Sequence, residues 1–144
     1  MFDHEKLDVY RKAVEFTGRA NEIAEAFPRG RHYLADQLQR ASLSIVLNIA
    51  EGAGKYSNVD KASFYARARG STTECGVVLD VCVKIRLLSS TSIIDDKRLL
   101  ERICSMLTKL IKAQRSAGSP ESTLPVNVNA PAPVTVFSED EVSS

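Results

Sequence analysis

The sequence predicts an all-α protein, an antiparallel up-down-up-down four-helix bundle over residues 1–116 followed by a disordered tail over residues 117–144. Apolar residues recur at steps of three and four along four long segments, which is the period of one helix face. The connections between these segments are short, and short connections favour antiparallel neighbouring helices. Together, the period and the short turns indicate a single bundle.

The first two helices are expected over residues 5–27 and 31–53. Pro28 separates them, because proline lacks the amide hydrogen and disfavours helical geometry in the residue before it. Gly52 and Gly54 mark the end of the second helix.

The last two helices are expected over residues 58–88 and 95–115. Ser57, with Asp60 three residues later, resembles a capping box and therefore indicates where the third helix starts. The polar segment 89–92 is short enough to be the turn between these two helices.

Charge divides the chain into two parts. Residues 1–116 hold all 19 Lys and Arg and carry a net charge of +5, whereas residues 117–144 carry −4. The second part is rich in Ser and Val, contains four of the five prolines and has no helical period, which predicts a disordered acidic tail.

Three observations predict a cytoplasmic protein with no membrane partner. The three cysteines are odd in number and lie in apolar helical patterns, so no disulfide framework is expected. The N-terminal residues carry charges where a signal peptide needs an apolar run. No segment approaches the ~18–20 uninterrupted apolar residues of a membrane helix.

Catalysis is not expected. A di-iron bundle needs Glu-x-x-His pairs, and neither of the two histidines, His4 and His32, stands three residues after a glutamate. Residues 52–55 lack the glycine spacing of a phosphate-binding loop. The sequence thus predicts a protein with no catalytic residues, metal site or cofactor.

The two central helices carry apolar residues on a second face, opposite the core stripe. A helix that is apolar all round is normally buried all round, so this face predicts a homo-oligomer interface. The alternative is a slightly apolar surface of a monomer. The candidate interface residues are Leu43, Leu47, Ala50, Ala66, Gly70, Val77, Val81 and Leu88.

Two further sets of charged residues give testable expectations. If the second and third helices form a hairpin, Arg40 and Glu74 lie opposite each other, which predicts a partly buried structural ion pair. A set of basic residues is the candidate nucleic-acid surface, although interleaved acids leave ordinary solvation as the alternative. That set comprises Arg11, Lys12, Arg19, Arg29, Arg31, Lys109, Lys112 and Arg115.

The segment 37–52, QLQRASLSIVLNIAEG, resembles the signature of the bacterial four-helix-bundle proteins encoded in 23S rRNA intervening sequences. Phe64-Tyr65, the segment 70–74 and the opening segment 7–13 are similar to the same family, and the resemblance covers about residues 3–113. This family includes accessory proteins of diversity-generating retroelements, which form pentameric barrels and bind a reverse transcriptase and nucleic acid. The resemblance implies a homopentamer without catalytic residues.

The leading hypothesis is therefore a non-catalytic, homopentameric scaffold that binds RNA or DNA through Arg and Lys. The alternative is a protein–protein adaptor that touches no nucleic acid, for example an accessory subunit of a reverse transcriptase.

Overall fold

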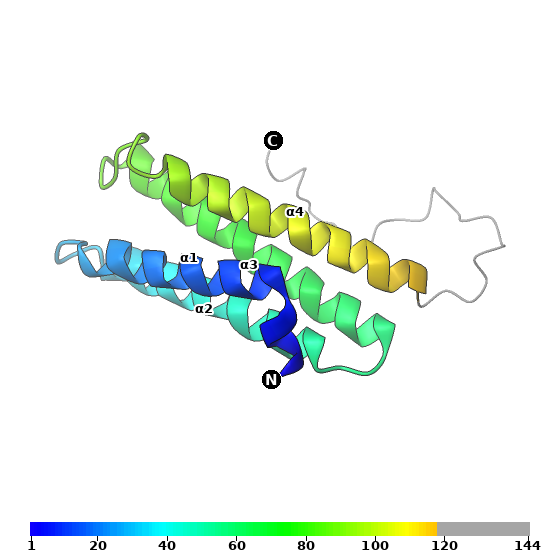
Figure 1. Ribbon diagram of the computed structural model, residues 1–144. Coiled ribbons are helices and arrows are strands. Elements are labelled where there is room, and N and C mark those ends of the chain that lie inside the picture. The colour runs from blue at the N-terminus through cyan, green and yellow to red at the C-terminus, as the bar shows by residue number, and fades with distance from the viewer. Residues whose placement is uncertain (118–144) are drawn as a thin grey trace.

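The computed structural model describes residues 1–117, which fold into four long helices, each antiparallel to the next (Figure 1). This confirms the predicted all-α four-helix fold. The predicted disordered tail lies outside the described residues, apart from Ala117, which ends the last helix. The elements are a short 3-10 helix η1 (Asp3–Lys6), α1 (Asp8–Glu25), α2 (His32–Ala53), α3 (Asn58–Lys84) and α4 (Ile94–Ala117).

Each helix packs mainly against its neighbours in the chain, and a smaller contact between α1 and α4 closes the ring. The space between the helices is filled by side chains with no exposed surface, as the 3.6-residue period requires. Within residues 1–117, no helix combines the length and apolar character needed to cross a membrane. The largest side chains that are fully buried are Phe16, Leu38, Ile45, Ile49, Leu79, Ile103 and Leu107.

Both ends of α1 lie inside the predicted boundaries of residues 5–27. Leu7 has an extended backbone, with φ −90° and ψ 128°, and it separates η1 from α1. At the other end the helix stops at Glu25, and Phe27 is half-buried against the core. Pro28 explains this end, because the residue before a proline is disfavoured in the helical region.

The α2–α3 turn is held by hydrogen bonds from both sides. The hydroxyl of Ser57 accepts from the backbone N–H of Asp60 at 3.0 Å, which confirms the predicted cap. The Nζ of Lys61 donates to the carbonyl oxygens of Ala53 at 2.9 Å and Gly52 at 3.3 Å. Lys61 therefore satisfies carbonyl groups at the end of α2 that would otherwise lack helical partners.

The end of α3 corrects the sequence prediction. The helix stops at Lys84, four residues before the predicted end at Leu88. Arg86 has a left-handed backbone with φ 64°, its N–H donates to the Val83 carbonyl, and the N–H of Leu87 donates to the Cys82 carbonyl. This pair of hydrogen bonds is the Schellman pattern, which usually places glycine where Arg86 stands.

Candidate functional site

The outer face of α2 exposes large apolar side chains, as predicted. The exposed fraction is 48% for Leu43 and 55% for Leu47. Ala50, on the same face, is half-buried. These residues lie opposite the core side chains Ile45 and Ile49, which have no exposed surface, so α2 is apolar on two opposite sides.

The outer face of α3 shows the same feature. Val77 and Val81 are 48% and 41% exposed, and Gly70 is exposed with no atom within 4 Å of where a Cβ would lie. Ala66 is half-buried and packs against the core at one edge of this row.

Val59 extends the outer row of α3, and the sequence analysis missed it. It is 75% exposed. It precedes Val77 by 18 residues, which is five whole helical turns, so the two side chains lie on one line along the helix. The helical spacing was visible in the sequence, but a residue in the first turn of a helix can equally belong to the preceding loop.

Leu88 does not belong to this row. It lies beyond the end of α3 and is half-buried against the core, because the Schellman turn directs the chain back over the bundle. The outer rows are therefore Leu43, Leu47 and Ala50 on α2, and Val59, Ala66, Gly70, Val77 and Val81 on α3.

The predicted Arg40–Glu74 ion pair is replaced by two other contacts. The Nε of Arg40 donates to Asp36 at 2.8 Å within α2, and both side chains are exposed. Glu74 accepts from Nε2 of Gln37 at 2.7 Å. The predicted hairpin register is nearly right, but α2 is rotated so that Gln37 and Ser44, rather than Arg40, face α3, where Ser44 contacts a serine hydroxyl at 2.8 Å.

Two of the eight predicted nucleic-acid residues are neutralised within the chain. Arg11 lies 3.7 Å from Asp8 and also donates to a backbone carbonyl. Arg19 donates to Asp96 at 2.7 Å and to Glu22 at 3.2 Å. The hydrogen bond to Asp96 and the charge of that carboxylate raise the pKa of Arg19. The positive charge of Arg19 is therefore paired with a carboxylate of α4.

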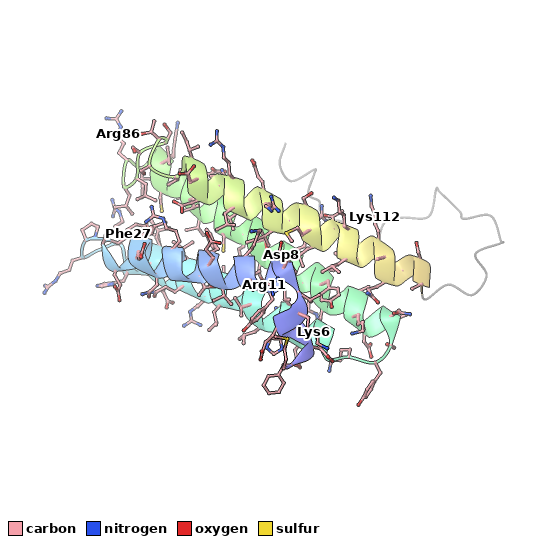
Figure 2. All side chains as sticks on the ribbon, viewed as in Figure 1. Lys6, Asp8, Arg11, Phe27, Arg86 and Lys112 are labelled. Carbon is pink, nitrogen blue, oxygen red and sulfur yellow. The ribbon has the colours of Figure 1, made fainter. Side chains whose placement is uncertain are left out.

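The other predicted cations do not form one surface. Arg29 and Arg31 lie in the α1–α2 turn, whereas Lys109, Lys112 and Arg115 lie along the last turns of α4, at the opposite end of the bundle. Figure 2 shows this separation, with Phe27 and Arg86 at one end and Lys112 toward the other. Lys12 is half-buried on α1 between these two groups.

Positive charge concentrates at the end that holds the α2–α3 turn. Residues 43–70 and 106–117, the halves of α2, α3 and α4 nearest this turn, are called the turn-end half and hold seven Lys and Arg against two Asp and Glu. The other described residues hold twelve against twelve. The turn-end half thus carries the whole net charge of +5, and its cations include Lys55, Lys61 and Arg67, which the sequence analysis had not selected.

Metal-ligating side chains and thiols are the residues of the described part of the chain that bear most directly on catalysis. In residues 1–117, no three His, Cys, Asp or Glu side chains are grouped so that they could hold a metal ion. Cys75 and Cys82 are buried, and burial raises the pKa of the Cys75 thiol to about 12. A thiol with so high a pKa stays protonated at neutral pH and is a poor nucleophile.

The sequence matches a known protein family but no curated protein. The family described as 23S rRNA-intervening sequence protein matches residues 5–109, which include α1, α2, α3 and most of α4. The family match, together with the four-helix architecture, shows that this chain belongs to the 23S rRNA-intervening sequence protein family.

Proposed function

We propose that the chain is a non-catalytic, cytoplasmic scaffold that assembles as a homopentamer and binds RNA or DNA through its surface cations. The observation that carries the proposal is the exposure of apolar residues along the outer faces of α2 and α3. Full burial of a Leu or Val side chain is worth about 1.5–3 kcal/mol relative to leaving it in water. A second copy of the chain that covers these rows would gain that free energy at several positions at once.

The nucleic-acid part of the proposal is supported by the charge of the turn-end half. A closed ring of identical chains repeats this excess of cations once per subunit, and phosphate binding grows with the number of charges neutralised. The resemblance to retroelement accessory proteins, which bind nucleic acid, supports the same class of ligand for this chain.

Sedimentation velocity of the full chain at micromolar concentration tests the assembly. Five copies of a 15.8 kDa chain give a particle of about 79 kDa. Leu47→Asp and Val77→Asp each place a charge in the outer rows and are expected to dissociate it. Val14→Asp is the matched control, because Val14 is 44% exposed on α1, outside both rows. A particle of about 16 kDa for the unmodified chain would refute self-association.

Salt dependence tests nucleic-acid binding. We expect the affinity for a labelled 23S rRNA fragment to fall steeply between 50 and 200 mM salt, roughly 10³-fold or more if the assembly neutralises six or more phosphates. Absence of binding at the lowest salt concentration would refute this half of the proposal and leave the assembly untouched.

The protein–protein adaptor is the second candidate, and the ion pairs of Arg11 and Arg19 favour it because they reduce the charge available to phosphates. In that case a partner such as a reverse transcriptase would bind the assembly by apolar contacts. Binding of a purified reverse transcriptase that persists unchanged from low to moderate salt, with no affinity for RNA or DNA, would favour the adaptor over the nucleic-acid scaffold.

A further inference from the structure

Tyr56 stands at the apex of the α2–α3 turn with its side chain fully exposed. A tyrosine has an apolar ring that would normally be at least partly covered by its own chain. The ring of Tyr56 is therefore open on both faces, at the end of the bundle where the cations concentrate.

The backbone beneath Tyr56 is fixed. Ser57 caps α3, and Lys61 ties the first turn of α3 to the last carbonyls of α2. The N–H of Gly54 donates to the Ala50 carbonyl at 3.2 Å, and that of Lys55 to the Gly52 carbonyl at 3.2 Å. An exposed ring on a fixed turn loses little backbone entropy when a ligand binds to it.

Two cations are held beside this turn by one aromatic ring. The Nζ of Lys55 lies 5.0 Å from the centre of the Phe64 ring, and the guanidinium carbon of Arg67 lies 4.5 Å from it. Both distances are within the range of cation–π contacts. Lys55 is only loosely paired with Glu51, at 3.9 Å. The Phe64 ring thus places two positive charges close together, and one of them, Lys55, directly precedes the exposed tyrosine in the sequence.

We infer that Tyr56 is a stacking platform for an unpaired base of single-stranded RNA or DNA, with Lys55 and Arg67 binding the adjacent phosphates. The inference rests on the nucleic-acid half of the proposed function and deepens it. Exposed aromatic rings beside cations bind single strands in this way, because every base presents a flat face whatever its sequence. In a duplex the interior bases are stacked on each other, so the ring cannot reach them without unstacking a step.

A second copy of the chain is the competing occupant, because Val59, on the outer row of α3, follows three residues later. The cations at Phe64 favour nucleic acid, because phosphates pair with Lys55 and Arg67, whereas an apolar contact between copies would take these charges out of water at a cost in free energy. Sedimentation distinguishes the two occupants, as only a contact between copies makes Tyr56 necessary for assembly.

The first test is fluorescence anisotropy of a labelled 15-nucleotide poly-dT strand with the full chain at low salt. Tyr56→Ala is expected to weaken binding by roughly 5- to 150-fold, and Tyr56→Phe, which keeps the ring, by about twofold or less. Tyr33→Ala is the matched control, since Tyr33 is 63% exposed at the opposite end of the bundle, and it should not change the affinity. Lys55→Ala with Arg67→Ala should weaken binding and flatten its salt dependence.

The second test uses the tyrosine emission of the protein, which contains four tyrosines and no tryptophan. Stacking of a base on Tyr56 should quench part of this emission when poly-dT is added, and Tyr56→Phe should abolish the quenching while it keeps the affinity. A variant with Tyr33→Phe should quench like the unmodified chain.

The outcomes separate the inference from the proposal beneath it. If the unmodified chain binds neither poly-dT nor the 23S rRNA fragment at low salt, the nucleic-acid function itself fails. If it binds the fragment but not poly-dT, the stacking inference alone is overturned. If it binds poly-dT and Tyr56→Ala binds equally well, the stacking inference alone is again overturned. If Tyr56→Ala changes the sedimentation of the free protein, the ring contacts a second copy and the inference is also overturned.

Discussion

Arg19 on α1 donates its Nε hydrogen to Oδ1 of Asp96 on α4 across 2.7 Å, and this contact joins the first helix to the last. Asp96 is 4% exposed, and its Oδ2 is buried without a hydrogen-bond partner among the described residues. The contact between α1 and α4 is the smallest of the four contacts between neighbouring long helices. This one ion pair therefore makes a large part of the polar contact between the two helices.

Removal of the cation should destabilise the bundle. We expect Arg19→Ala to lower the free energy of unfolding by about 1–3 kcal/mol, because it leaves a buried carboxylate without its partner. In a double-mutant cycle by urea denaturation, Arg19→Ala combined with Asp96→Ala should cost clearly less than the sum of the two single changes. Additive costs would show that the two side chains do not interact energetically.

Gly52 should not tolerate even a methyl group. A Cβ there would lie 2.8 Å from Cε1 of Tyr65 and 3.1 Å from Cβ of Phe64, and the Tyr65 ring is buried. Gly52→Ala is therefore expected to destabilise the fold, because overpacking costs about 1–3 kcal/mol and exceeds the gain in helix propensity. The melting temperature of this variant should fall. Gly18→Ala, with no atom within 4 Å, is the control and should raise the melting temperature. Equal shifts for both variants would contradict the close packing at Gly52.

Burial of Cys75 should make the protein less stable in alkali. Its thiol has a pKa of about 12 in the folded chain, against an ordinary value of 9.0. Between these values the unfolded chain releases a proton that the folded chain keeps, so unfolding becomes easier by about 1.4 kcal/mol per pH unit above pH 9. Below pH 9 the thiol has no effect on the pH dependence. Urea titrations at several pH values should show a shallower alkaline loss for Cys75→Ala than for the unmodified chain.

A substitution at Gly70 is expected to affect the stability of the single chain and the stability of the proposed assembly in opposite directions. In the single chain the site is open, so Gly70→Leu should raise helix stability by up to about 1 kcal/mol. In an assembly whose copies pack on the outer row of α3, the same side chain would force the interface apart and lower the sedimenting mass. Gly18→Leu, equally open in the single chain, provides the comparison. If Gly70→Leu leaves the mass unchanged, this position lies outside the interface.

The sequence predicted the helices, because their apolar residues recur with the helical period. It also predicted the helix ends at which one residue, such as a capping serine or a proline, has a well-defined effect. Ser57 caps its helix as expected, and Pro28 ends the first one. The end of α3 could not be predicted, because Arg86 adopts the left-handed conformation without being a glycine. Leu88 was assigned to the outer row for that reason alone.

The side-chain contacts were less predictable than the helices. The hairpin register was nearly right, but a modest rotation of α2 exchanges Arg40 for Gln37 opposite Glu74, and periodicity does not define rotation that closely. Exposed residues such as Tyr56 have no period to mark them. The stacking role that we infer for Tyr56 depends on the contacts of Lys55 and Arg67 with the Phe64 ring, which only the fold brings together.

The order in which the helices pack has a consequence for how the protein matures. Because helices adjacent in the chain are adjacent in space, most contacts are local, and bundles of this kind fold within microseconds to milliseconds. Two copies at micromolar concentration meet far more slowly, since specific docking proceeds at about 10⁵–10⁷ M⁻¹s⁻¹. In the assembly that we propose, every newly made chain finishes folding alone, with Leu47 and Val77 in water, and during this interval aggregation competes with assembly.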